Sequence, residues 1–465
     1  MSRPRHDSLA LASVCLAALM FGLEISSVPV TLPTVRRELG GSLAEVSWVM
    51  SAYTLAVASV LMPTGALADR FGRKRLLAGA IAAFGLASLL CGMATSTPAL
   101  IAARGLQGAA GGAMLSCQIA VLSNQFAAGT RRARAFGAWG VVFGVGLGFG
   151  PLAGGLMIDA ASWRWVYLVQ VAVAPAALAM LLAGAQESRD PRAPRVDVAG
   201  MATLALGVVG LVLWITEGPN LGLGSLPALA IIAAAAALLT AFVVVERTRA
   251  DPMIDFGVFG IRPFSGAILG SAGMNFSFWP LIVYLPIYLE ADLGYSAAAA
   301  STILLAYTLP TLVLPPLGER LALRYQPRVV IPLGLLTIGL GILALRLGGA
   351  VAEPNWATLA PGLLLAGVGL GITNTPVTNT TTASVPSARA GMASGIDMSA
   401  RMTSLAINIS IMGLLLSSDG FGAVTLYGGT AVILFAVASR VIFTRACSRT
   451  CSFAASAQCT VCARG

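Results

Sequence analysis

Apolar runs of about 20 residues or more, the length that a helix needs to cross a membrane, recur along the whole chain. The strands of a membrane β-barrel would be shorter and would alternate in polarity. Of the residues, 57% are hydrophobic and 10% are charged, against roughly 25% charged in a soluble domain. Since lipid admits only structures that satisfy their own backbone hydrogen bonds, the chain is predicted to be an all-α polytopic membrane protein.

The runs predict fourteen spans with both termini in the cytosol. This topology places most of the 29 lysines and arginines on the cytosolic side, as the positive-inside rule requires. The net charge of +10 is therefore explained by the membrane topology. Because the cations are dispersed over many short segments and form no basic face, no nucleic-acid partner is expected. The expected spans are 8–33, 43–66, 76–96, 97–126, 135–158, 163–186, 197–216, 224–246, 263–289, 296–318, 328–349, 354–386, 389–418 and 421–445.

The spans divide into six, two and six. We expect an N-terminal six-helix bundle at 1–186, two additional helices with cytosolic linkers at 187–262, and a C-terminal six-helix bundle at 263–445. Two six-helix halves are common in carriers that work by alternating access. Residues 446–465 form a tail with four cysteines, for which we expect disorder in the reducing cytosol and not a zinc site. These cysteines are Cys447, Cys451, Cys459 and Cys462.

A glycine- and cation-rich segment, Gly65 to Arg75, joins the second and third expected spans. Glycines at both ends permit a tight reversal of the chain. Asp69 could accept hydrogen bonds from the start of a facing helix, and the cations could reach carboxylates of the other half, which would make a cytosolic latch. The alternative is an ordinary positive-inside loop. The residues of the predicted latch are Gly65, Asp69, Arg70, Gly72, Arg73 and Lys74.

Two charges lie inside expected spans of the first half. Arg104 is costly in lipid and should face the bundle interior with a partner. Glu24, at a similar depth by the helical rise of 1.5 Å per residue, is the expected partner. A buried carboxyl beside a cation can bind and release a proton, so the pair is predicted to couple protons. The alternative is a static ion pair that holds the helices together.

The fifth expected span carries a run of small residues. Gly146, Gly150 and Gly154 recur every four residues, so they form a smooth groove on one face, while Pro151 adds a kink and Gly155 a further small position. Small residues let two helices approach closely. A smooth, bent helix suits a surface that slides or rocks against a neighbour, and the alternative is a plain packing seam.

Two further groups of side chains are candidates. Asp397 and Arg401 share one helical face at i, i+4, and they either gate the cytosolic side or simply pair with one another. A second group is rich in aromatic residues and amides and could line a cavity for apolar or cationic organic molecules, although each member could equally be plain packing. It comprises Tyr53, Asn275, Phe276, Phe278, Trp279, Tyr284, Tyr307, Asn374 and Asn379.

The sequence lacks the residues that several other classes of protein require. The sequence holds no phosphate-binding loop of the Walker type and no channel selectivity filter. His6 is the only histidine, so neither a histidine metal site nor a histidine-based catalytic triad can form. We therefore expect no enzyme activity, no metal and no cofactor, with an ion gradient as the energy source.

The quoted segments resemble the major facilitator superfamily, and within it the fourteen-span drug:proton antiporters. Gly65 to Arg75 matches the superfamily's loop signature, and Arg104, Gln107 and Gly108 match its fourth-span motif. The fifth-span groove with Pro151 matches the motif of antiporters as opposed to symporters. At position 24 the chain has glutamate where the family usually has aspartate, so the carboxylate is kept.

The resemblance implies proton-driven efflux of drugs or other small amphipathic molecules through the bacterial inner membrane, by a monomer that works by alternating access. Glu24 would carry the proton and Arg104 would tune it. Asp69, Arg70 and Arg73 would form the latch, and the fifth-span groove part of the rocking interface. An uptake permease, or an exporter of one metabolite or antibiotic, is the alternative on the same fold.

Overall fold

The computed structural model describes residues 3–126, 130–189, 197–249, 256–385 and 390–444, and within these ranges it is helical without any strand. The helices of the first half are α1 (Arg3–Leu39), α2 (Leu43–Phe71), α3 (Arg73–Gly92), α4 (Thr97–Gln125), α5 (Thr130–Ala160) and α6 (Arg164–Gly184). Two more follow, α7 (Val198–Leu221) and α8 (Leu226–Thr248). The second half contains a short 3₁₀ turn, η1 (Phe256–Gly260), and then α9 (Arg262–Asn275), α10 (Phe278–Ala291), α11 (Ala297–Val313), α12 (Pro315–Tyr325), α13 (Pro327–Gly349), α14 (Trp356–Ala383) and α15 (Ala390–Thr444).

Ten of the described helices are long and apolar enough to cross a membrane, or eleven if the bent pair α11 and α12 counts as one span. The helix α15 alone covers two of the expected ranges, because it runs through a break at Gly420, where φ is 74°. The all-helical membrane architecture is thus confirmed, whereas the count of fourteen spans stays a prediction.

Prolines interrupt two spans that the sequence pattern predicted as continuous. Within 263–289 the chain breaks at Phe276 and Ser277, between α9 and α10. Pro280 has no N–H to donate to the carbonyl of Phe276, so a continuous helix would lack this hydrogen bond, which explains the break. Within 296–318 the axes of α11 and α12 differ by 49°, and Pro315 begins the second helix. Hydropathy does not detect such breaks, because proline leaves the apolar run intact.

The turn between α2 and α3 is shorter than the predicted loop. Helix α2 continues to Phe71 and α3 begins at Arg73, so only Gly72 is non-helical, with φ at 114°. An L side chain rarely adopts this φ, which explains the glycine. Gly65 lies inside α2 and takes no part in the reversal, so the expectation of a tight turn at Gly65 was wrong.

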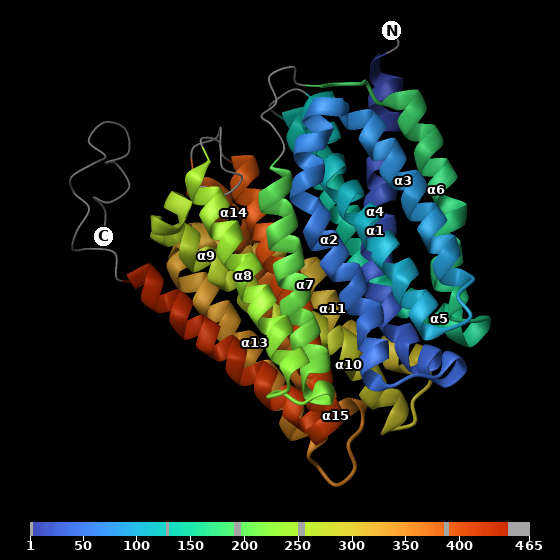
Figure 1. Ribbon diagram of the computed structural model, residues 1–465, viewed down its shortest axis with the longest axis vertical. Coiled ribbons are helices and arrows are strands. Elements are labelled where there is room, and N and C mark those ends of the chain that lie inside the picture. Colours follow the sequence, from blue (N-terminus) through green and yellow to red (C-terminus); the bar gives the residue numbers. More distant parts are fainter. Residues whose placement is uncertain (1–2, 127–129, 190–196, 250–255, 386–389, 445–465) are drawn as a thin grey trace.

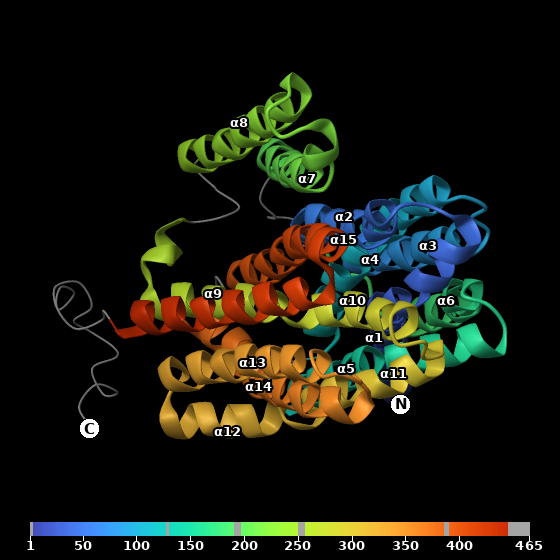
Figure 2. The ribbon, with the colours of Figure 1, turned by 90° about the horizontal axis from the view of Figure 1, so that it is seen from below.

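The helices form two groups with an additional pair beside them. Figures 1 and 2 show α1–α6 on one side and most of α9–α15 on the other, with α10 and α11 reaching beside α1 and α5, and α7 and α8 as a pair along the outside. Helix α7 contacts each group, since Val212 packs in one apolar cluster with Leu55 of α2 and Ala406 of α15. The indole N–H of Trp48 on α2 also donates to Glu217 of α7, at 3.1 Å. The additional pair is therefore anchored on both halves.

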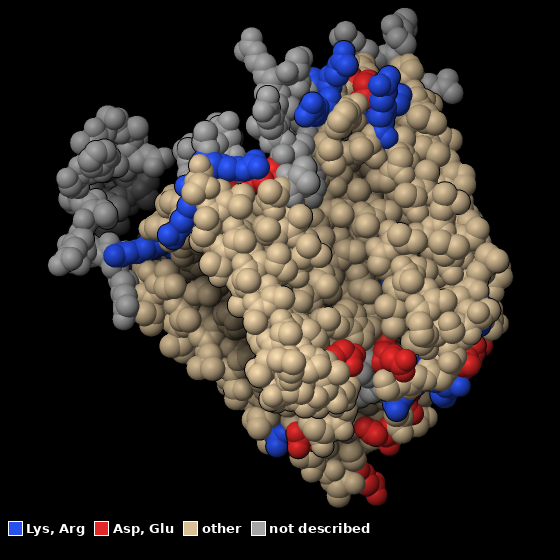
Figure 3. Space-filling model, in the orientation of Figure 1, with Lys and Arg blue, Asp and Glu red and all other residues tan. Residues whose placement is uncertain are grey.

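Charge distinguishes the two ends of the molecule. We call the end where α1 begins the basic end and the end where α1 finishes the acidic end. Figure 3 shows lysines and arginines gathered at the basic end, whereas acidic side chains gather at the acidic end. The positive-inside rule assigns the basic end to the cytosol, and this orientation stays a prediction.

Candidate functional site

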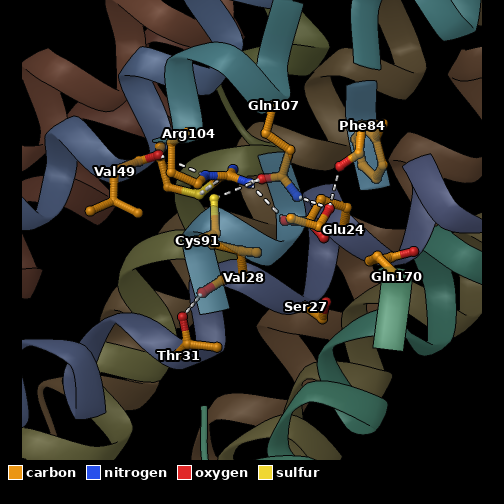
Figure 4. A network of polar contacts seen from close by, with 12 residues as sticks. Glu24, Ser27, Val28, Thr31, Val49, Phe84, Cys91, Arg104, Gln107 and Gln170 are labelled. Atoms are coloured by element: carbon orange, nitrogen blue, oxygen red, sulfur yellow. Dashed lines mark hydrogen bonds and ion pairs between the residues drawn. The ribbon is translucent and has the colours of Figure 1, made fainter. Parts of the chain in front are cut away.

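The centre of the first half holds a fully buried ion pair. Arg104 of α4 and Glu24 of α1 lie 2.7 Å apart, Nη1 to Oε1, and both side chains are 0% exposed (Figure 4). The same Nη1 donates to Gln107 Oε1 at 2.6 Å, and Nε donates to the carbonyl of Val49 at 3.1 Å. An arginine so deeply buried requires such compensation, because an isolated charge in an apolar interior is very costly. The partnership predicted from depth alone is present in the structure.

Aromatic and small residues complete the surroundings of Arg104. Its guanidinium lies 4.1 Å from the ring centroid of Tyr53, a distance that allows a cation–π interaction. Gly108, one turn along α4, permits this approach, since a Cβ there would lie 2.3 Å from the carbonyl oxygen of Tyr53. Gln107 donates in turn to Ser88 of α3 at 2.8 Å. Helices α1 to α4 thus all contribute to one polar network.

The two carboxyl oxygens of Glu24 differ in their hydrogen bonding. Oε1 accepts from Arg104, whereas Oε2 has no hydrogen-bond partner in the described part of the chain. Gln170 of α6 lies beside this carboxyl in Figure 4, and its amide donates to the carbonyl of Met20 at 3.2 Å. A carboxyl that pairs through one oxygen and keeps the other free can accept a proton there without rearrangement.

The glycines of α5 face two different helices. A Cβ at Gly146 would lie 3.0 Å from the backbone nitrogen of Leu23, one at Gly150 would lie 1.9 Å from Ser26 Oγ, and one at Gly154 would lie 2.9 Å from the Ser27 carbonyl. The i, i+4 groove therefore packs on α1, within the same half. Pro151 lies inside α5 as expected.

The other face of α5 meets the second half. A Cβ at Gly155 would lie 2.3 Å from Ser301 Oγ of α11, and Thr308 of α11 donates to the Gly148 carbonyl at 2.8 Å. Of the predicted groove residues, Gly155 thus lies at the interface between the halves, as does Gly148, whereas Gly146, Gly150 and Gly154 pack on α1. Whether either seam moves during function stays a prediction.

The segment between α2 and α3 contacts its own half. The carboxylate of Glu187, just after α6, accepts from the backbone N–H groups of Lys74 at 3.1 Å and Arg75 at 3.2 Å, while Lys74 Nζ donates to the Leu182 carbonyl at 2.8 Å. The N–H of Arg73 donates to the Ser188 carbonyl at 3.0 Å. The side chain of Asp69 lies outside the described residues. A latch that includes Asp69 and Arg70 and reaches the other half therefore stays a prediction.

Glu187 acts as the cap of α3, because α3 has no side-chain hydrogen bond from its own N-cap Gly72. Glu187→Ala should lower the free energy of unfolding by about 0.5–1 kcal/mol, since two N–H groups at a helix start lose their acceptor. Thermal unfolding of the purified protein in detergent measures the change. Glu353→Ala, in the exposed segment before α14, is the control; equal melting temperatures for both variants would contradict the capping role.

Asp397 and Arg401 form a network within the second half. Arg401 Nε lies 3.2 Å from Asp397 Oδ2, and its other nitrogens donate to Asn374 at 2.8 Å and Thr378 at 2.9 Å, both on α14. Ser271 of α9 donates to Asp397 Oδ1 at 2.5 Å. The expected i, i+4 pair is present and ties α9, α14 and α15 together. A gating contact with the Asp69 segment stays a prediction.

The predicted cavity residues lie in several different environments. Tyr53 belongs to the Arg104 site, and Asn374 binds Arg401. Asn275 donates to the Ser271 carbonyl, Phe276 lies 5.0 Å from Phe435 between ring centroids, and the hydroxyl of Tyr284 donates to the Ile409 carbonyl. Trp279 and Tyr307 are buried, Asn379 is exposed, and the side chain of Phe278 lies outside the described residues. A shared substrate cavity therefore stays a prediction.

The sequence pattern missed the contacts between the halves. Ser47 of α2 lies 3.3 Å from the hydroxyl of Tyr284 on α10, Arg37 of α1 pairs with Glu290 of α10, and the N–H of Ala298 on α11 donates to Asp159 of α5. For Arg37, Glu290 and Asp159 the sequence offers only charges at span ends, which any membrane protein has, and it offers no signal for the contact of Ser47 with Tyr284. These three contacts lie at the acidic end. Figure 1 shows α13 and the last part of α15 sloping away from the first half toward the basic end.

Two helical halves, with buried polar groups inside the spans and glycine seams at their interface, are typical of membrane transporters. The sequence profile of the Major Facilitator Superfamily matches residues 14–272 and 264–446. The chain belongs to this superfamily.

Relatives and solved structures agree with this assignment. The chain is 30% identical to the multidrug resistance protein Stp of Mycobacterium tuberculosis, over 89% of this chain and 76% of the relative. It is 33% identical to the puromycin resistance protein pur8 of Streptomyces alboniger, over 86% and 80% of the two chains. It is also 33% identical to the cephamycin export protein CmcT of Amycolatopsis lactamdurans, over 94% and 92%. The fold is similar to a crystal structure of the peptide transporter POT in complex with sulfate, with a TM-score of 0.70, 17% identity and 94% of each chain covered.

Proposed function

We propose that the chain exports drugs or similar small organic molecules in exchange for protons. The observation that carries this proposal is the carboxyl of Glu24, which is fully buried, ion-paired with Arg104 through one oxygen, and without a described partner on the other. The names of the relatives, which are resistance and export proteins, support efflux over uptake. The absence of a phosphate-binding loop from the sequence favours an ion gradient as the energy source.

Glu24 links proton binding to helix movement through α1. A proton on Glu24 neutralises the charge that pairs with Arg104 and leaves a buried cation without its counter-charge, which is costly. Two residues further along α1, Ser26 donates to the Gly146 carbonyl of α5 at 3.0 Å, and α5 contacts α11 of the other half. A shift of α1 is therefore transmitted to the interface between the halves, and this produces alternating access.

The conformation fits the state that faces the cytosol. The contacts of Ser47, Arg37 and Asp159 with the second half close the acidic end, which is expected to lie outside. Substrate then enters from the cytosol and leaves after the acidic end opens. We place the protein in a bacterial inner membrane with both termini in the cytosol. Apolar or cationic molecules fit the aromatic residues and the scarcity of charge in the spans.

Efflux of a cationic dye from cells tests this function directly. Loaded cells that express the protein should lose dye faster than cells with an empty vector, and a protonophore should abolish the difference. Extrusion that survives collapse of the proton gradient would contradict proton coupling. Faster accumulation, instead of loss, would favour the uptake permease.

A further inference from the structure

We propose that Arg37, Glu290 and Asp159 form a proton-operated gate at the acidic end, with Glu290 as its proton acceptor. We call this group the outer clasp. The inference rests on the proposed function, since it places a second proton-binding group where protons enter an exporter of this kind. Glu290 would thus be a second proton-binding residue in addition to Glu24.

The first observation is an ion pair that spans the two halves. Arg37 Nη2 of α1 lies 3.7 Å from Glu290 Oε2 of α10. The same nitrogen donates to Thr34 Oγ1 on its own helix, at 2.9 Å, which holds the arginine toward α10. Because α1 also carries Glu24, the clasp and the central ion pair belong to one helix.

The second observation is the unequal burial of the two partners. The side chain of Glu290 is 4% exposed, whereas that of Arg37 is 68% exposed. Glu290 Oε1 has no hydrogen-bond partner among the residues that the structure describes. Arg37 can therefore return to water at little cost, whereas the buried carboxylate depends on it. A proton on Glu290 removes that dependence, because the neutral acid tolerates burial.

The third observation is a second carboxylate at the same joint. Asp159, near the end of α5, lies close enough for its charge to act on Glu290. Its Oδ2 accepts from the N–H of Ala298, in the first turn of α11, at 3.2 Å, so it too joins the halves. Asp292 follows α10 on the same side. Among the described residues, the charges that act on Glu290 are that of Arg37 on α1, which opposes proton uptake, and that of Asp159 on α5, which favours it.

The geometry gives the direction of the effect. While Glu290 is charged, the pair with Arg37 holds α1 against α10 and the acidic end stays closed. When the outer medium becomes acidic, protonation breaks the pair, and the halves can separate there. The outer clasp therefore makes opening of the acidic end depend on protonation of Glu290. The transporter then opens to the outside less often when no proton is available to enter.

A labelling experiment on the full-length protein tests the clasp. Ser301 on α11 is fully buried against Gly155 of α5, so a cysteine there becomes reactive only when the acidic end opens. In a chain whose seven native cysteines are replaced by serine, Ser301→Cys is treated in intact cells with a membrane-impermeant maleimide. The thiolate is the form that reacts, and its fraction falls with pH; relative to an exposed reference cysteine labelled at the same pH, wild-type labelling at position 301 should rise as external pH falls. Glu290→Gln should label up to about fivefold faster at neutral pH, as expected for one partly exposed ion pair, and should respond less to pH.

Two further variants make the result specific. Glu38→Gln removes an ion pair of 3.2 Å with Arg164 at the same end, but within the first half, and should label like the wild type. Arg37→Gln breaks the same ion pair by changing its exposed partner, and it should reproduce the faster labelling. This variant keeps the test available even if Glu290→Gln folds poorly. Labelling of both clasp variants at the wild-type rate, or equal acceleration by Glu38→Gln, would overturn the proposal.

Labelling needs neither substrate nor coupled transport, so the two proposals can fail separately. Dye efflux that ignores protonophore, together with fast labelling of Glu290→Gln, refutes antiport and supports the gate. Coupled efflux with unchanged labelling of both clasp variants refutes the gate and supports antiport.

Discussion

Glu24→Gln should abolish transport driven by a proton gradient while the protein still reaches the membrane. Glutamine keeps an acceptor for Arg104 but cannot bind and release a proton. The expected loss of gradient-driven efflux is at least about 100-fold, the lower end of what positioned proton-transfer groups contribute. Initial efflux rates, normalised to the amount of protein in the membrane, measure it. Efflux at the wild-type rate would exclude Glu24 as the proton carrier.

Two control variants separate coupling from folding. Glu24→Asp keeps a carboxyl and should retain measurable coupling. Removing one partner of a buried pair costs about 3–5 kcal/mol, because the other charge is left uncompensated. The double variant Glu24→Gln with Arg104→Gln removes both charges, so it should melt at a higher temperature than Glu24→Gln alone, yet still fail to couple. Gradient-driven efflux by the double variant would mean that the pair is only structural.

Gly150→Leu should produce the second large loss, through the seam between α5 and α1. Even a Cβ at this position would lie 1.9 Å from Ser26 Oγ and 3.3 Å from the Leu23 carbonyl. Overpacking of a tight contact costs about 1–3 kcal/mol, and the branched side chain of leucine adds three carbon atoms beyond this Cβ. We expect transport to fall at least about tenfold, in accord with that free energy. Dye efflux and thermal unfolding together measure the effect.

The chain offers a graded set of controls for this prediction. Gly150→Ala should be milder, since the nearest atom is a hydroxyl that can turn away. Gly148→Ala should be nearly neutral, because its Cβ would meet only Leu312 and the Thr308 carbonyl, at 3.9 to 4.0 Å. Full activity of Gly150→Leu, or equal losses for Gly148→Ala and Gly150→Leu, would show that the groove on α1 does not matter.

The central ion pair was accessible to prediction because lipid makes an isolated charge so costly. Arg104 needed a partner at its own depth, and Glu24 was the acid of the first half that met this condition. The fold class followed from the same physics, since long apolar runs can only be helices in a membrane. The i, i+4 pair of Asp397 and Arg401 followed from helical geometry alone.

Other features depend on contacts that periodicity does not encode. The spacing of Gly146, Gly150 and Gly154 identified one face of α5, but not that α1 covers it while α11 covers the opposite side. The break at Phe276 arises from one missing N–H at Pro280, which leaves hydropathy unchanged. Arg37 and Glu290 lie at span ends where charges are ordinary, so only the packing of α1 on α10 makes them a pair.

Proton movement in proteoliposomes tests the central claim most directly. Purified protein is reconstituted with a pH-sensitive dye in the lumen, and transported substrate is then added without an imposed gradient. In an exchange, substrate that enters the lumen is matched by protons that leave it, so we predict a rise in lumenal pH that Glu24→Asp retains and Glu24→Gln lacks. Substrate flux without proton movement, or an equal pH change with Glu24→Gln, would contradict drug:proton exchange through Glu24.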